Sequence, residues 1–145
     1  MYRIILLSLT MLILGACQLL TIENDKKDDS LYQALGGKAG IERIVDIFIY
    51  EIGETSEIVH HFEESNIERF REKQIEHICL LSGGPCTYTG DEMLPVHQGM
   101  NINEAEFNAT ADAMIRALNT AGISLSSRNR LLGIIASMRD QVIYQ

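Results

Sequence analysis

The sequence predicts an all-α fold built from separate, short helices. Apolar residues recur three or four positions apart in several stretches, which is the spacing of one helix face. Only two prolines occur in the 145 residues, and runs that alternate β-branched with polar residues are few. The length suits one domain with a proper core.

Composition narrows the class of protein. Hydrophobic residues make up 46% of the chain, and long low-complexity tracts are absent from the sequence, so a globular domain is expected. The formal net charge is −8. Because the basic residues gather into no patch, nucleic acid is not expected as a partner.

Residues 1–16 have the layout of a secretory signal peptide. Arg3 precedes an apolar run over residues 4–14, which is short for a membrane span, and small residues follow it. Together with Cys17 this end resembles a bacterial lipobox, where signal peptidase II cuts and the cysteine becomes lipidated. An uncleaved N-terminal anchor and an ordinary secreted protein are the alternatives.

Residues 17–29 comprise Cys17 and a polar linker. The linker is charged and has no core-forming pattern, and it would reach roughly 40 Å at about 3.3 Å per residue. Gln18 after the cysteine resembles lipoproteins of the outer membrane. We therefore expect residues 30–145 to form a domain tethered by lipid to a bacterial cell envelope, at the outer membrane facing the periplasm.

Three helical segments are expected in the first half of this domain. Ser30 caps a short helix that stops before Gly36, a longer helix spans residues 39–52, and one or two turns cover residues 56–62. The apolar face of the longer helix consists of Ile41, Ile44, Val45, Phe48 and Ile52.

The next helix carries a lone amide on its apolar face. Ser65 and Glu68 form a capping-box pattern that opens it. Its face consists of Ile67, Phe70, Gln74, Ile78 and Leu81. After a Gly/Pro-rich connector, Asp91 caps a short helix that ends in His97. Gln74 and His97 can thus face each other across a gap, although spacing alone does not make a lone histidine a metal ligand.

Two further helices complete the predicted domain. Asn103 and Glu106 form a second capping-box pattern, which opens a helix that runs to Ala121. Its core face is Phe107, Ala111, Met114 and Leu118, and the last helix, residues 127–144, buries Leu131, Ile134, Ile135, Met138 and Val142. One edge of that last stripe can also form the floor of a cofactor pocket.

The sequence of the central stretch resembles that of the group I truncated haemoglobins, a family of two-over-two helical globins. The matching segments are Lys73-Gln74, residues 81–85, Tyr88-Thr89-Gly90, Met93 and Val96-His97-Gln98-Gly99. Outside the centre, the resemblance continues through residues 30–32, residues 35–37, Phe48, Ile102, Phe107 and residues 121–122. It extends over about residues 30–143.

This resemblance implies a haem b whose iron is held by a neutral nitrogen of His97. A backbone carbonyl near Met93 would accept a hydrogen bond from the other ring nitrogen. The implied partners are O2, NO or CO and a reductase, and nitric oxide oxidation is a further implied reaction. Phe48, Phe62, Phe70, Met93 and Ile102 would contact the haem.

The implied distal side departs from the family at one position. The family usually has a tyrosine directly after the residue that matches Phe48, and this chain has Ile49. Tyr50 lies about 100° further around the helix, so it does not replace the missing hydroxyl, and Gln74 is the only hydrogen-bond donor carried over. We expect faster oxygen release as a result.

Other polar residues near the implied pocket have less specific patterns. By resemblance, Ser65, Lys73 and Tyr88 approach the haem propionates, whereas the plain interpretation of Lys73 is a solvated helix face. His77 follows Gln74 by three and is a minor candidate for the pocket edge.

Two residue pairs have no assigned role in the implied pocket. His60 and His61 are adjacent, so their side chains should diverge and not share a metal ion. Cys79 and Cys86 either form a disulfide or remain free thiols.

Three functions are compatible with these observations. The first is a globin that binds diatomic gas. The second is a surface-tethered haem-holding or redox lipoprotein with no oxygen role. The third is a haem-free helical interaction module, in which His97 and Gln74 are incidental.

Overall fold

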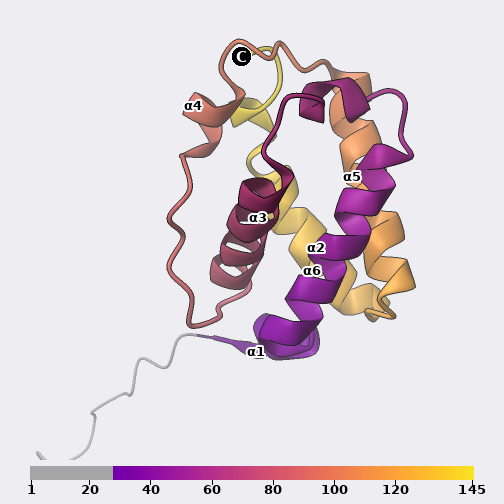
Figure 1. The fold of residues 1–145 in the computed structure, drawn as a ribbon. Coiled ribbons are helices and arrows are strands. Elements are labelled where there is room, and N and C mark those ends of the chain that lie inside the picture. The colour runs from indigo at the N-terminus through magenta and orange to yellow at the C-terminus, as the bar shows by residue number, and fades with distance from the viewer. Residues whose placement is uncertain (1–27) are drawn as a thin grey trace, which may run out of the picture.

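The computed structural model describes residues 28–145, and these residues form a helical domain (Figure 1). The elements are α1 (Ser30–Ala34), α2 (Gly37–Gly53), η1 (Val59–Phe62), α3 (Ile67–Leu81), α4 (Met93–His97), α5 (Glu104–Thr120), α6 (Leu125–Ala136) and η2 (Arg139–Gln141). The all-α prediction is confirmed: in this part of the chain the one β-type pairing is an isolated bridge between Ile102 and Ile143. The predicted signal peptide, Cys17 and most of the linker lie outside the described residues.

The core forms where α2 packs against both α3 and α5. The face predicted for α2 is buried as expected. It meets Ala113, Met114, Ala117 and Leu118 of α5, and Ile75, Ile78 and Cys79 of α3. Figure 1 shows α3 and α5 on opposite sides of α2, with α6 passing behind α2. Among residues 28–145, no helix combines the length and the apolar character needed to cross a bilayer.

Three of the predicted helix caps are displaced by one residue, and two of these helices, α1 and α4, have no side-chain cap. The N-cap of α3 is Asn66, whose side chain accepts a hydrogen bond from the Arg69 amide at 2.9 Å, so the prediction of Ser65 was wrong. Asp29, not Ser30, precedes α1, and α4 begins after Glu92 without a side-chain cap. At the start of each of these helices two polar residues are adjacent, and the spacing of the apolar residues does not show which of the two is the cap.

The capping box at the start of α5 is confirmed. The Asn103 side chain accepts from the Glu106 amide at 3.0 Å, and the Glu106 carboxylate accepts from the Asn103 amide at 2.8 Å. Both contacts satisfy backbone N–H groups that a helix leaves unpaired in its first turn.

The last helix is shorter than predicted. It begins after Ser124 and ends at Ala136, because the Ser137 hydroxyl donates to the Ile134 carbonyl and competes with a further helical turn. The chain then turns through η2 and lies beside the segment after α4. There the Gln145 carbonyl accepts from the amides of Gly99 and Asn101 at 3.2 and 3.0 Å.

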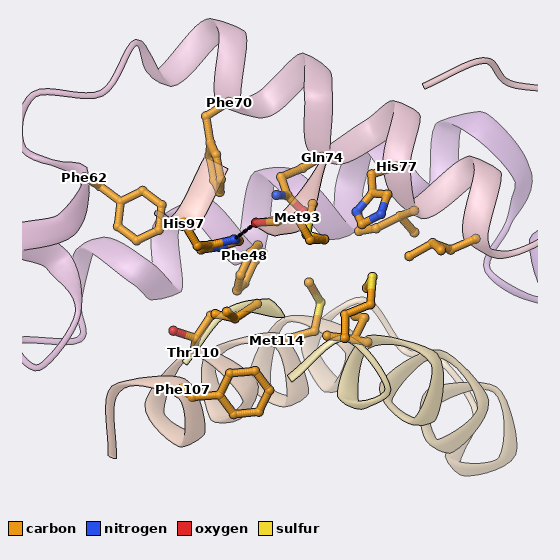
Figure 2. Close-up of a pocket in the computed structure, with 15 residues that line it drawn as sticks. Phe48, Phe62, Phe70, Gln74, His77, Met93, His97, Phe107, Thr110 and Met114 are labelled. Atoms are coloured by element: carbon orange, nitrogen blue, oxygen red, sulfur yellow. Dashed lines mark hydrogen bonds between the residues drawn. The ribbon is translucent and has the colours of Figure 1, made fainter. Parts of the chain in front are cut away.

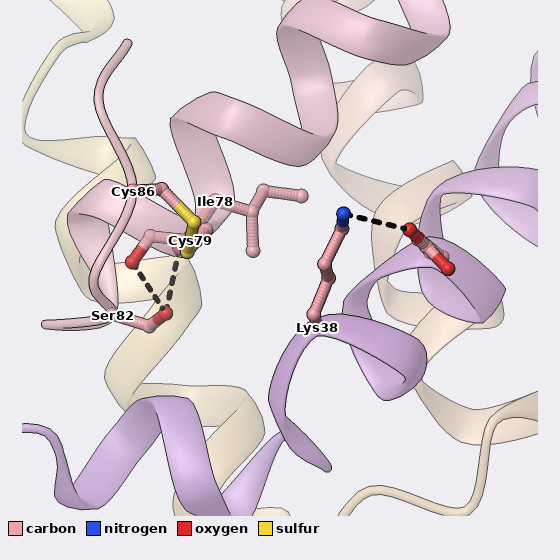
Figure 3. The surroundings of a disulfide bond; sticks show 6 residues. Lys38, Ile78, Cys79, Ser82 and Cys86 are labelled. Atoms are coloured by element: carbon pink, nitrogen blue, oxygen red, sulfur yellow. Dashed lines mark hydrogen bonds and ion pairs between the residues drawn. A yellow bond between two sulfur atoms is a disulfide. The ribbon is translucent and has the colours of Figure 1, made fainter.

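A disulfide joins the end of α3 to the connector that leads to α4. The bond links Cys79 and Cys86, whose Cα atoms are 5.8 Å apart (Figure 3). The chain packs so tightly here that a Cβ added to Gly84 would lie 2.6 Å from the Cys79 sulfur. Of the two alternatives that the sequence left open, the paired cysteines are the one observed.

Cys86→Ser should lower the free energy of unfolding by about 2 to 3 kcal/mol, because the unfolded chain regains the freedom of a short closed loop. Urea unfolding measures this difference. Dithiothreitol should destabilise the unmodified chain by a similar amount and leave the variant unchanged. A variant as stable as the parent under oxidising conditions would contradict this expectation.

Candidate functional site

A largely apolar cavity of about 150 Å³ lies between α3 and the α5–α6 pair (Figure 2). Apolar cavities that hold a few polar groups are typical small-molecule and cofactor sites. The lining residues are Phe48, Phe62, Phe70, Gln74, His77, Ile78, Leu81, Met93, His97, Phe107, Thr110, Met114, Ile135, Met138 and Val142.

Helix α3 presents three successive residues of one face to this cavity. Phe70, Gln74 and His77 are spaced by four and three, and Figure 2 shows all three projecting from α3 toward it. The side-chain amide of Gln74 makes no hydrogen bond to any of residues 28–145, so it is available to a molecule in the cavity. Burial lowers the pKa of His77 below its ordinary value, so this imidazole is neutral at pH 7.

His97 is the last residue of α4, and its ring lies between the walls formed by α3 and α5 (Figure 2). Its Nδ1 lies 2.7 Å from the Met93 carbonyl oxygen, one helical turn earlier. A carbonyl can only accept, so Nδ1 carries the proton and Nε2 keeps its lone pair. This is the arrangement of an imidazole prepared to ligate a metal through Nε2.

The three predicted phenylalanines, Phe48, Phe62 and Phe70, line this cavity, and Ile49 does not. Phe62 and Phe70 meet edge to face, with ring centroids 5.1 Å apart. Ile49 lines an adjoining hollow that it shares with the same two rings. Tyr50 is 64% exposed, so its hydroxyl does not enter the cavity, as the helical spacing predicted.

The predicted polar residues gather at one mouth of the cavity. Ser65, Lys73 and Tyr88 line an opening together with Gln74 and His97. The Lys73 side chain is only 15% exposed, and its ammonium group lies 3.2 Å from the Glu76 carboxylate. The plain interpretation of Lys73 as a solvated residue is therefore wrong.

The carboxylate of Glu76 ties the connector to α3. It accepts a hydrogen bond from the Thr89 amide at 2.8 Å, and this bond is the largest of the effects that lower the pKa of Glu76. The Tyr88 hydroxyl donates to the Asp91 carbonyl at 2.7 Å, while burial raises its pKa. One part of the mouth, around Tyr88 and Asp91, is thus formed by a connector that has no helix of its own.

Another opening reaches His97 from the side of α5. It is lined by Ile102 and Ser65 as well as Phe62 and Phe70. Every residue predicted to contact the cofactor therefore borders the cavity or a hollow that shares residues with it.

Sequence reasoning missed or under-weighted part of the lining. Phe107, Met114, Ile135, Met138 and Val142 were predicted as core, with only an edge of the last stripe assigned to a pocket; all five line the cavity. No sequence pattern marked Thr110 as a lining residue. Its hydroxyl donates a hydrogen bond to the Glu106 carbonyl at 2.9 Å, so its hydrogen bond is made within α5.

The donor set fits a haem. The wall is apolar and rich in aromatic rings, as a planar macrocycle requires, and His97 offers an imidazole nitrogen whose partner nitrogen is already hydrogen bonded. Polar and cationic groups occur at the mouth, where carboxylate substituents would reach solvent.

Comparison with known proteins gives consistent matches. Residues 30–144 match the model of the family described as bacterial-like globin. The group 1 truncated hemoglobin of Mycolicibacterium paratuberculosis is 31% identical over 113 residues, which cover 78% of this chain and 83% of that protein. A group 1 truncated hemoglobin of Tetrahymena thermophila is 28% identical over 99 residues, 68% of this chain and 82% of that protein.

Solved structures agree on the fold. The Fe(III) form of truncated hemoglobin from Tetrahymena pyriformis superposes with a TM-score of 0.77 at 23% identity, covering 79% of this chain and 98% of that one. Hemoglobin from Chloroflexus aurantiacus gives 0.68 at 28% identity, covering 77% and 96%.

Proposed function

Because this chain belongs to the bacterial-like globin family, among the group 1 truncated haemoglobins, we propose that it holds haem b and binds O2 or another diatomic gas. The observation that carries this proposal is the His97 ring, whose Nε2 lone pair is available inside an apolar cavity. When bound, haem supplies an iron with a free coordination position for the gas.

The Met93 carbonyl orients the proximal ligand in this proposal. By accepting a hydrogen bond from Nδ1–H it holds the His97 ring in one tautomer and makes Nε2 more basic. Ser65, Lys73 and Tyr88 would lie near the haem carboxylates. Lys73 would then share its charge between Glu76 and a propionate.

Gln74 is the donor that we propose for the gas. A neutral hydrogen bond contributes about 0.5 to 1.5 kcal/mol net, and the rings of Phe48, Phe62 and Phe70 line the same cavity as this amide. With Ile49 in place of a tyrosine and Tyr50 turned to solvent, this donor set is weaker than the one the family usually has.

The family match favours gas binding over the two other candidate functions. A haem-holding or redox lipoprotein would need no amide in the distal wall, and a haem-free interaction module would need no cavity at His97. Binding of O2 or CO needs ferrous iron, so we propose a separate reductase as a partner.

We also propose that the domain is tethered to a bacterial envelope, at the outer membrane facing the periplasm, through lipid on Cys17. The support is the order of Arg3, the apolar run and the small residues before the cysteine. The disulfide between Cys79 and Cys86 is compatible with an oxidising compartment.

His97→Ala should abolish tight haem binding. The purified chain incubated with haemin should show a Soret band and, after dithionite and CO, a carbonmonoxy spectrum. The variant should lose haem to an acceptor protein at least about tenfold faster, which corresponds to about 1.4 kcal/mol of lost binding. His77→Gln removes another imidazole of the same wall and should retain haem. A colourless parent chain, or a variant that holds haem equally well, would refute the proposal.

Ile49→Tyr should slow O2 dissociation by about tenfold, because one added hydrogen bond near the upper end of the usual range is worth about 1.4 kcal/mol. Stopped-flow displacement of O2 by CO measures the rate. Ile49→Phe adds the ring without the hydroxyl and should leave the rate within about threefold of the parent. Equal slowing by both variants would show that bulk, not hydrogen bonding, controls release.

Cys17→Ser should prevent lipid attachment. The full chain expressed in a bacterial host should incorporate labelled palmitate and sediment with outer membranes, and the variant should lose the label. Cys86→Ser, which keeps Cys17, should remain labelled. An unlabelled parent chain in the membrane fraction would indicate an uncleaved anchor, and release into the soluble fraction would indicate an ordinary secreted protein.

A further inference from the structure

Three potential metal ligands converge where η1 meets the start of α5. The Nε2 atoms of His60 and His61 lie 3.5 and 3.3 Å from the same carboxylate oxygen, Oε1 of Glu106. The two rings lie side by side, with centroids 4.0 Å apart. The expectation that adjacent histidines diverge was therefore wrong, because the tight 3-10 turn brings their side chains to one side.

The donor atoms in this cluster are not fully used by the protein. The Nε2 atom of His61 is buried and has no hydrogen-bond partner among the described residues, although Oε1 lies near it. A buried ring nitrogen that makes no hydrogen bond to protein is unusual, and a metal ion is one group that would satisfy it. The His61 and Glu106 side chains are 14% and 17% exposed, whereas His60 is 52% exposed and leaves a path from solvent.

Glu106 is held in place for this contact by its other oxygen. Oε2 accepts from the Asn103 amide at 2.8 Å in the capping box, and this hydrogen bond lowers the pKa of Glu106. Its Oε1 is thus left to face the two histidines.

We propose that His60, His61 and Glu106 bind one divalent transition-metal ion, with Zn²⁺ as the best fit. Zinc bonds to imidazole and carboxylate are about 2.0 to 2.1 Å long, so ligand atoms at tetrahedral angles lie about 3.3 Å apart. Both nitrogen–oxygen separations are near that value, and all three ligand atoms lie within 4.8 Å of one another. Two imidazoles and one carboxylate leave a fourth position for water.

The alternative is a pair of hydrogen-bonded ion pairs without metal. In that case each ring N–H should point at the carboxylate, whereas the His61 nitrogen is close to Oε1 without the alignment of a hydrogen bond. None of the three ligands is a residue that we propose for haem or gas, although His61 and Glu106 border the opening that reaches His97.

Isothermal titration of the full chain with ZnCl2, with and without prior haemin loading, tests this proposal independently of haem uptake. One Zn²⁺ should bind per chain. His60→Ala should weaken binding at least about tenfold, and this exposed residue can be removed without disturbing the core. Glu106→Gln should do the same while keeping the capping box, because glutamine also serves at that position.

Matched controls are available on the same surface and in the same chain. Glu104→Gln removes a carboxylate of the same helical turn that pairs with Arg139, and His77→Gln removes a histidine elsewhere; neither should change Zn²⁺ affinity. Zinc K-edge absorption should show two imidazole nitrogens and oxygen at about 2.0 to 2.1 Å. No binding by the parent chain at about 1 mM Zn²⁺, or equal affinity in the cluster and control variants, would overturn the proposal.

Discussion

The hydrogen bond between the His97 ring and the Met93 carbonyl is the contact on which the site depends. It decides which ring nitrogen carries the proton and which faces the cavity. Helix α4, which provides both groups, has only five residues. A helix this short is not stable by itself in water, so the rest of the molecule must hold it.

Contacts at both ends of α4 hold this short helix in place. On its C-terminal side, the amides of Gly99 and Asn101 donate to the Gln145 carbonyl, so the end of the chain supports the residues after His97. On its N-terminal side, the connector is joined to α3 by the disulfide and by the Glu76–Thr89 hydrogen bond. His97 thus lies on a segment whose position is determined by α3 and the C-terminus.

The sequence was most informative where residues repeat with helical spacing. The α2 face, the Phe70–Gln74–Ile78 part of the α3 face and the Asn103–Glu106 capping box were predicted and are present. Their signals are local, since each needs only positions within about two turns. Ile67 of the predicted α3 face is exposed, and the buried residues of that helix are Ile75, Ile78 and Cys79. The resemblance to a family supplied the role of His97, which spacing alone did not.

Features that depend on distant contacts were not predictable in this way. The early end of α6 results from a serine that bonds its own helix and from pairing with residues forty positions earlier in the chain. Ile135, Met138 and Val142 were predicted as core because an apolar stripe looks the same whether it meets protein or a cavity. The convergence of His60 and His61 on Glu106 required the 3-10 turn and the docking of α5 beside it.

The covalent link between Cys79 and Cys86 also has a consequence for how the chain matures. Newly made polypeptide carries thiols, and these close into a ring only where electrons can be passed to an acceptor. Until that oxidation occurs, the connector leading to the proximal histidine is held by its non-covalent contacts alone. The final rigidity of the ligand-bearing segment is therefore acquired after synthesis, at a place and time set by the surrounding redox potential.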